Sequence, residues 1–277
     1  MRQIGCALVP AVILFANPLC AGAMLMVTDV SGKVLLDGRT PVKLIDGIEV
    51  HKTLTLGPGG RLALLNLVTG VETVFKGPCR FRLDGEGRPQ GARPALIRPV
   101  AVAQGPLRLK QESLVPAGIL MRGAEATAEG PRLEVAPLGP VVLEASPLLS
   151  WKDPGSCTST RFRLYDDAGA ILHEAKVEGT SFQLPVLLPG KSYTWVLECG
   201  VSGRAPRMAS GCIKVLDEVA RLQLEKVRPA AGAAFADRVL YAALLDDMGL
   251  LKEGRAMWQA LAKERPADKR LGDLAKR

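Results

Sequence analysis

The chain has few of the residues that most often carry enzyme chemistry. Aromatic residues make up 4% of its 277 residues, and it holds only two histidines, His51 and His173. No C-x2-C pair indicates a zinc site, and no G-x-S-x-G or S-x-x-K motif indicates an activated serine. The acidic pairs Asp166-Asp167 and Asp246-Asp247 fit a solvated turn and a helix end. We therefore expect a protein that is not an enzyme and that holds no cofactor or metal.

A nucleic-acid-binding surface is also missing. The formal net charge is +8, but lysine and arginine are spread along the chain. A nucleic-acid interface would need a basic stripe interleaved with stacking aromatic rings. The excess charge indicates a solvated basic surface with, at most, unspecific attraction to an anionic envelope.

The N-terminus carries the one long apolar run of the sequence. Arg2 precedes an apolar segment, 4–20, and Ala21-Gly22-Ala23 supplies small residues at the positions that a signal peptidase reads. This pattern predicts a signal peptide over residues 1–23, cleaved after Ala23, and a periplasmic or otherwise exported protein. The alternative is an uncleaved anchor, because apolar character continues through Met24–Val27, although the run is short for a bilayer span. Membrane association would then depend on this segment alone.

Four cysteines follow the predicted cleavage site: Cys79, Cys157, Cys199 and Cys212. An even number in an exported chain indicates disulfides. Four cysteines allow three pairings. We favour Cys199–Cys212, which flank a hairpin-like connection, with Cys157 as the competing partner for either.

Short apolar stretches separated by turns fill residues 24–123, and an Ala/Glu/Gly-rich linker is expected over 124–131. Asp37-Gly38, Asp46-Gly47 and Thr69-Gly70 are turn pairs, and Val42–Ile45 is expected to be a strand between the first two. Gly32-Lys33-Val34, the segment 54–64 with its Gly57-Pro58-Gly59-Gly60 turn, Gly70-Val71-Glu72 and Gly77-Pro78 resemble the FecR-type periplasmic β domain, over about 25–83. FecR regulators span the inner membrane, whereas this chain opens with an export signal. The resemblance implies the domain and leaves the regulatory role in doubt.

A second β unit is expected over 132–216, with about seven strands. Trp151 follows an apolar strand start after Pro147, Phe162 and Leu164 alternate, and Leu188-Pro189-Gly190 precedes Tyr193, Trp195 and Leu197. This spacing resembles a fibronectin type III-like sandwich, in which the tryptophan faces the core. Trp151 could instead contact a ligand. We expect Trp151, Tyr193 and Trp195 to form structural core.

The apolar period changes to that of helices after Asp217. One helix is expected up to Pro229, a second ends at Gly249, and a third stops at Pro266. The pattern over 233–266 resembles a single tetratricopeptide repeat, although Gly254 and Leu261 stand where alanines are usual. One repeat does not bury its own faces, so the helices should pack on the sandwich or on a partner. Tyr241, Leu245 and Trp258 are candidates for partner contact, with core packing as the other interpretation.

The expected fold is mainly β, with two sandwich or roll domains followed by a helical hairpin within 217–277. We expect an exported, non-enzymatic envelope protein that binds or scaffolds protein partners. The alternatives are a peptidoglycan or polysaccharide binder that uses an exposed aromatic ring, and a hydrolase assembled from scattered residues. The partner would be another envelope protein or a cell-wall component.

Overall fold

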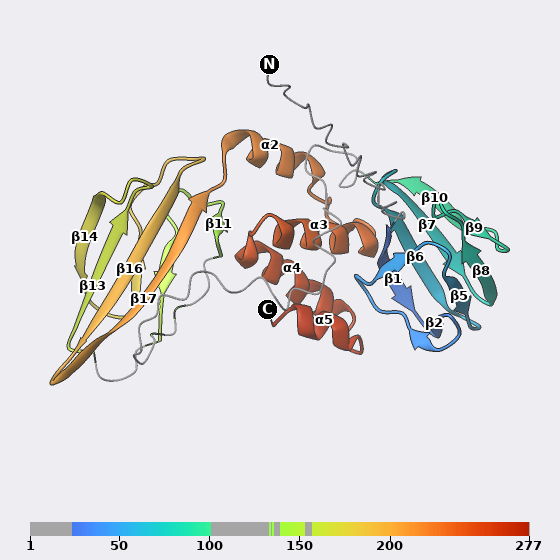
Figure 1. Ribbon diagram of the computed structural model, residues 1–277, viewed down its shortest axis with the longest axis horizontal. Coiled ribbons are helices and arrows are strands. Elements are labelled where there is room, and N and C mark those ends of the chain that lie inside the picture. The colour runs from blue at the N-terminus through green and yellow to red at the C-terminus, as the bar shows by residue number, and fades with distance from the viewer. Residues whose placement is uncertain (1–23, 101–132, 134, 136–138, 153–156, 277) are drawn as a thin grey trace, which may run out of the picture.

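The computed structural model describes residues 24–100, 133, 135, 139–152 and 157–276. The predicted signal peptide, the predicted linker 124–131 and most of the extension after Val100 lie outside these residues. Three parts follow one another along the longest axis, with a β domain at one end, a β sandwich at the other and the helices between them (Figure 1). The expected fold class, mainly β with a C-terminal helical segment, is confirmed.

The first domain consists of two antiparallel sheets. One has the strand order β10-β7-β6-β1-β4 and the other the order β3-β2-β5-β8-β9. Leucine, valine and phenylalanine side chains from both sheets form the core between them. The strands are β1 Met24–Ser31, β2 Val34–Leu36, β3 Thr40–Pro41, β4 Gly47–Glu49, β5 Thr53–Leu56, β6 Arg61–Asn66, β7 Val71–Lys76, β8 Cys79–Leu83, β9 Pro89–Gln90 and β10 Leu96–Pro99.

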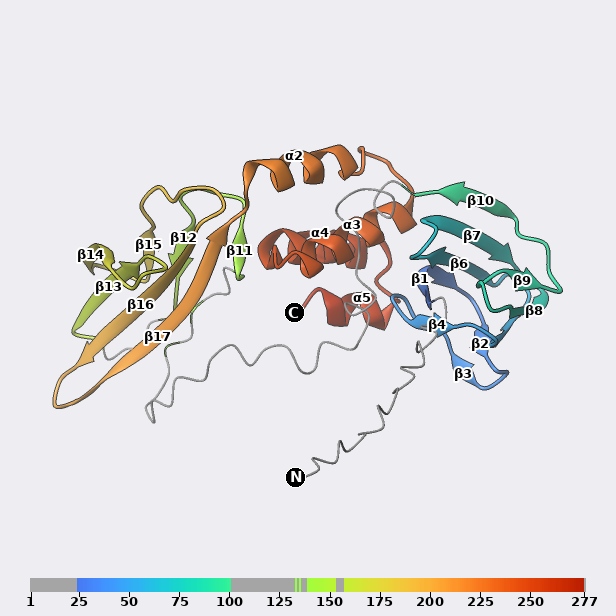
Figure 2. The same ribbon diagram turned by 45° about the horizontal axis from the view of Figure 1, so that its top comes forward.

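The sheet that contains β1 is covered on both faces. Leu62 and Leu64 of β6 point into the sandwich core, whereas Leu65 packs against the helices. Strands buried on both faces lose the apolar–polar alternation of a half-exposed strand. This explains the unbroken apolar run 62–65 in the sequence. The first domain and the helices therefore form three layers, which are sheet, sheet and helices (Figure 2).

The glycines of the Gly57-Pro58-Gly59-Gly60 turn and of the Gly77-Pro78 turn lie next to one another. The Gly57 carbonyl accepts the Gly60 N–H at 2.9 Å, and the Gly60 carbonyl accepts the Gly77 N–H at 2.7 Å. A Cβ atom at Gly77 would overlap the Gly57 carbonyl oxygen. The glycines in the G-P-G-G and G-P motifs thus permit a close approach of two turns.

The strand expected over Val42–Ile45 is wrong. These residues form a turn closed by Lys43 and Asp46, and Ile45 has a φ of 65°. That left-handed conformation is unfavourable for a β-branched residue. Leu44 and Ile45 nevertheless pack into the apolar clusters of the helices. Burial of their side chains against the helices outweighs the local preference for a strand.

The second domain is a fibronectin type III-like sandwich. Its main sheet has the order β11-β17-β16-β13-β14, and the pair β12-β15 covers it. The Tyr193 hydroxyl accepts the Leu188 N–H at 3.0 Å, which is the tyrosine corner of such sandwiches. The strands are β11 Val141–Val142, β12 Leu148–Ser150, β13 Ser159–Tyr165, β14 Ile171–Val177, β15 Ser181–Gln183, β16 Ser192–Val201 and β17 Arg204–Val215.

The three expected helices are present, and a fourth follows them. They are α2 Glu218–Val227, α3 Phe235–Asp247, α4 Leu251–Glu264 and α5 Lys269–Leu274. Asp217 caps α2 by accepting the Ala220 N–H at 2.8 Å. After α3 the chain turns at Gly249, which has a φ of 77°, and the Leu250 N–H bonds back to the Leu245 carbonyl at 2.9 Å. Within the described part of the chain, no helix has both the length and the apolar character needed to span a membrane.

Candidate functional site

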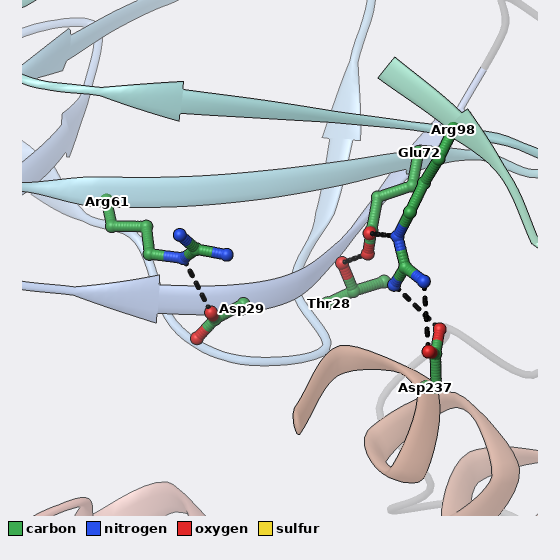
Figure 3. Close-up of polar contacts among 6 residues, drawn as sticks. All are labelled: Thr28, Asp29, Arg61, Glu72, Arg98 and Asp237. Carbon is green, nitrogen blue, oxygen red and sulfur yellow. Dashed lines mark hydrogen bonds and ion pairs between the residues drawn. The ribbon is translucent and has the colours of Figure 1, made fainter. Parts of the chain in front are cut away.

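A partly buried charged network joins the first β domain to the helices. Arg98 of β10 donates from Nε to Glu72 Oε2 at 2.7 Å, and its two terminal nitrogens bind both carboxylate oxygens of Asp237 at 2.7 and 2.9 Å. Thr28 Oγ1 donates to Glu72 Oε1 at 2.5 Å. Figure 3 shows Arg98 placed between the carboxylates of β7 and α3. We call Thr28, Glu72, Arg98 and Asp237 the Arg98 clamp.

A second ion pair group lies beside the clamp and uses the neighbouring residue of β1. Asp29 accepts Arg61 Nε at 3.0 Å (Figure 3) and Arg265 Nη1 at 2.7 Å. Arg265 follows α4, and its guanidinium carbon lies 3.4 Å from the centroid of the Phe235 ring on α3. This distance is within the range of a cation–π contact. Asp29 thus joins β1 and β6 of the sheet to the ends of two helices.

A β-bulge lets two consecutive residues of β1 face the helices. Side chains normally alternate across a strand, but the register of β1 with β6 shifts between Val27 and Asp29. Thr28 and Asp29 therefore both reach charged groups on the helix side, as a bulge re-aims side chains. Thr28 is 0% exposed, Asp29 3% and Glu72 1%.

The Arg98 clamp satisfies its own charges. The hydrogen bond that Arg98 donates to Asp237 is the largest cause that raises the pKa of Arg98 above its already high ordinary value, and Glu72 raises it further against the opposing effect of burial. A bidentate arginine–carboxylate pair combines strength with a fixed geometry. The Thr28 hydroxyl donates to Glu72, and each member of the group has a partner within it. The arrangement is suited to holding two elements together.

The sandwich meets the helices through a different kind of contact. The Val141 N–H bonds to the Gly249 carbonyl at 3.3 Å, and Lys252 binds Glu144 at 2.7 Å. Both partners of this ion pair are more than half exposed. Val141 and Leu143 also pack on the apolar cluster of the helices.

A groove lies between α2, α3 and α4, next to this second contact. It has a cavity volume of about 340 Å³, and Leu143, Tyr241, Leu245, Glu253 and Met257 are among the residues that line it. Burial raises the pKa of the Glu253 carboxyl, and Glu144 nearby raises it further, while its own backbone N–H and Lys252 lower it. Burial is also the largest cause that raises the pKa of Tyr241.

The sandwich residues expected to be core are core. Trp151 is 6% exposed, and Tyr193 and Trp195 are each 7% exposed. Trp195 lies opposite Gly211 of β17, where a Cβ atom would come within 2.8 Å of the indole. Trp151 is thus part of the core between the sheets, and the ligand-contact interpretation is not supported.

The helical residues proposed for partner contact are also buried. Tyr241 is 5% exposed, and Leu245 and Trp258 are each 2% exposed. Trp258 donates from its indole N–H to Asp246 Oδ2 at 2.7 Å. Core packing, the other interpretation of these three side chains, therefore describes them. A helical segment that covers the first β domain must bury its apolar stripe there, although Tyr241 and Leu245 also line the groove.

The favoured disulfide is wrong, and the competing cysteine is the partner. Cys157 and Cys199 form the disulfide, with their Cα atoms 5.4 Å apart. Cys199 points into the sandwich core, whereas Cys212 lies on the exposed face of β17 beside Thr194. Adjacent strands pair Thr194 with Cys212, so the hairpin that suggested Cys199–Cys212 sets the two side chains on opposite faces. Cys79 and Cys212 are free.

The two histidines lie in different domains. His51 sits in a turn of the first domain with a φ of 65°, and His173 stacks on Phe182 in the sandwich. Among the described residues, no group of three or more His, Cys, Asp or Glu side chains is placed to hold a metal ion. The groove and a second cavity between α4 and α5 contain no histidine. Neither of these two cavities therefore supports the hydrolase alternative.

The sequence reasoning missed the Arg98 clamp and the Asp29 ion pairs. The signal that could have found them is polar residues inside apolar strands. Thr28-Asp29 interrupt the strand 24–31, and Glu72 stands beside the apolar run of β7. Such residues are almost never fully buried without a partner. Arg98 and Asp237 lie 139 residues apart in the chain, and Asp29 and Arg265 lie 236 apart, so local spacing could not reveal these pairs.

No protein-family model and no curated protein matches the chain. Among solved structures, it is similar to CopC from Methylosinus trichosporium OB3b, with 17% identity, a TM-score of 0.26, and coverage of 31% of this chain and 96% of that one. It is also similar to the fn3 domain of the human collagen alpha-1(XX) chain, with 16% identity, a TM-score of 0.27, and coverage of 34% and 89%. A two-domain fibronectin type III segment from chicken tenascin matches at 15% identity and a TM-score of 0.26, covering 69% and 97%. Similarities of this size carry no information on activity or partners.

Proposed function

We propose that the protein is an exported, non-enzymatic envelope protein that binds other proteins through its fibronectin type III-like sandwich. In this proposal the first β domain and the helices form the base, and the sandwich is the module that they present. The disulfide Cys157–Cys199 supports an oxidising compartment. The signal-peptide pattern over residues 1–23 points the same way.

The observation that carries the proposal is that the helices pack on the first β domain of the same chain. Their buried apolar side chains and Asp237 contact the first β domain, and among the large apolar side chains of the described helices Val219 and Leu222 of α2 stay exposed. The sandwich keeps more large apolar side chains exposed than the first domain does. These are Leu148, Ile171, Leu172, Val186, Leu188 and Met208. Ile171 and Leu172 lie on β14, which is an edge strand that can accept a further strand.

The peptidoglycan alternative gains no support from the aromatic residues. All three tryptophans of the chain are buried, and so are Tyr193 and Tyr241, while Tyr165 is only partly exposed. A sugar ring stacks on an exposed aromatic face. Protein binding through apolar side chains and a strand edge is therefore the function that the geometry supports best.

Photo-crosslinking in intact cells tests the proposal. A photoreactive amino acid at Leu172 on β14 or at Val186 should give crosslinked species of discrete mass in the envelope fraction. The same amino acid at Val68, an exposed apolar residue of the first domain, serves as the control. Absence of adducts from every sandwich position, or equal adducts from Val68, would overturn the proposal. Removing residues 217–277 is not a useful test, because it would expose the buried face of the first domain.

A further inference from the structure

The groove between α2, α3 and α4 contains two polar groups that can take a further partner. The Glu253 carboxylate makes no ion pair with another described residue, and the Tyr241 hydroxyl makes no hydrogen bond with one. The Glu253 carboxylate is half-buried, and neither its oxygens nor the Tyr241 hydroxyl is among the fully buried, unpartnered polar atoms of the described residues. Both groups are therefore open to a bound molecule that supplies hydrogen-bond donors.

The wall of the groove is apolar. Leu143 approaches from the segment after β11, Leu245 from α3 and Met257 from α4. Methionine adapts its shape to different partners. The volume of about 340 Å³ is at the small end of the range for ligand sites and would hold one or two side chains rather than a cofactor.

The charge of the groove is opposite to that of the whole chain. Glu225 is paired with Arg228 at 3.3 Å and Glu144 with Lys252 at 2.7 Å, which leaves Glu253 as the unbalanced charge. The chain as a whole carries a formal charge of +8. A negative spot on a basic protein selects a cation and disfavours anionic partners.

We propose that this groove binds a lysine or arginine side chain of a partner protein, with Glu253 as the counter-ion, the Tyr241 hydroxyl oxygen as a second acceptor, and the apolar wall against the methylene stem. Lysine and arginine side chains carry a positive charge at the end of an apolar methylene stem, so they can pair with a carboxylate and contact apolar side chains at the same time. The inference goes beyond the proposed function, because it adds a second contact surface on the helices. It assumes only that the partner is a protein.

A model peptide tests the proposal on the full chain. The probe is a fluorescein-labelled peptide, acetyl-Ala-Leu-Lys-Leu-Ala-amide, and versions with arginine, norleucine or glutamate in place of lysine. Fluorescence anisotropy should show binding of the lysine and arginine peptides and at least fivefold weaker binding of the other two. Equal binding of the norleucine peptide would overturn the proposal, because the groove would then select only apolar surface. Pentylamine that competes as strongly per mole as the peptide would assign the site to free amines and would also overturn it.

Variants of the two polar groups locate the binding. Glu253→Gln keeps the shape and removes the charge, and should weaken the lysine peptide about tenfold. Tyr241→Phe should weaken it by a smaller factor, about threefold. Glu178→Gln removes an equally negative residue from an exposed position of the sandwich and should leave binding unchanged. Unchanged binding in Glu253→Gln would contradict the assignment.

Folding and pH separate a binding role from a structural one. The pKa of Glu253 is raised in the folded protein, so the ionised carboxylate opposes folding above that pKa. Glu253→Gln removes this charge and should therefore keep or raise the melting temperature. Peptide binding to the wild type should fall as the pH falls through the raised pKa, and this fall should be absent in Glu253→Gln. If no peptide binds while the sandwich still crosslinks in cells, the groove assignment fails and the proposed function stands.

Discussion

The first β domain meets the helices across a buried sheet face, whereas the sandwich meets them at one end, through an exposed ion pair, a backbone hydrogen bond and the side chains of Val141 and Leu143. On the first side, Glu72 and Asp29 are almost fully buried, and arginines hold both of them. On the second side, the ion pair Lys252–Glu144 is open to water, and one backbone hydrogen bond accompanies it. Removing one partner of a buried ion pair strongly lowers the free energy of unfolding, whereas removing one partner of an exposed pair changes it little. The helices therefore belong, energetically, to the first domain.

Breaking the Arg98 clamp should have the largest effect on stability. Arg98→Ala leaves the Glu72 carboxylate buried without a counter-charge, and should lower the free energy of unfolding by about 3–5 kcal/mol. Urea denaturation measures this change. Arg221→Ala, which breaks an exposed pair with Glu218 on α2, is the matched control and should change it by less than about 0.5 kcal/mol. Similar values for the two variants would show that the clamp does not hold the domains together.

Removing the disulfide should lower the stability of the sandwich and leave that of the first β domain and the helices unchanged. Cys157→Ser releases a loop that spans 42 residues, and should destabilise the sandwich by about 2–4 kcal/mol. Cys212→Ser is the control and should have almost no effect, because Cys212 is free and exposed. Thermal melts followed by tryptophan fluorescence measure both. A larger loss in Cys212→Ser than in Cys157→Ser would restore the pairing of Cys199 with Cys212.

A substitution at Gly254 tests the packing between α3 and α4. A Cβ atom there would overlap Oδ1 of Asp246. The other carboxylate oxygen of Asp246, Oδ2, accepts the Trp258 indole N–H. Gly254→Ala gains about 0.5–1 kcal/mol of helix propensity, yet should lower the free energy of unfolding by about 1 kcal/mol because Asp246 must move. Chemical denaturation measures the sign. A stabilised Gly254→Ala variant would show that Asp246 can move at no cost.

Breaking the contact between the helices and the sandwich should have the smallest effect. Lys252→Ala removes the exposed pair with Glu144 and should cost between 0 and about 1 kcal/mol. The same denaturation assay measures it, and 1 M salt should reduce the difference from the wild type. A loss as large as that of Arg98→Ala would mean that the two attachments are alike.

Local patterns predicted most of the elements. The apolar period and the stops at Pro229, Gly249 and Pro266 predicted the three long helices, because capping and proline act within one turn. The spacing of Trp151, Tyr193 and Trp195 predicted the sandwich core. The resemblances to the FecR-type domain and to a tetratricopeptide repeat stay predictions.

The elements that were missed depend on contacts between distant segments. Val42–Ile45 has the composition of a strand, but the helices bury Leu44 and Ile45, and the chain turns there instead. The pairing of Cys157 with Cys199 depends on which face of β16 a residue occupies. The Arg98 clamp joins positions 139 residues apart. Interactions of this kind have no local signature in a single sequence.

Native-state hydrogen exchange tests most directly whether the helices form one unit with the first domain. Amides of β6 and α3 should exchange with a common free energy of opening, and Arg98→Ala should lower it for both by the same amount. Amides of β16 should keep their own value in that variant. If α3 instead opened together with β16, or if Arg98→Ala left the exchange of α3 unchanged, the helices would not belong to the first domain.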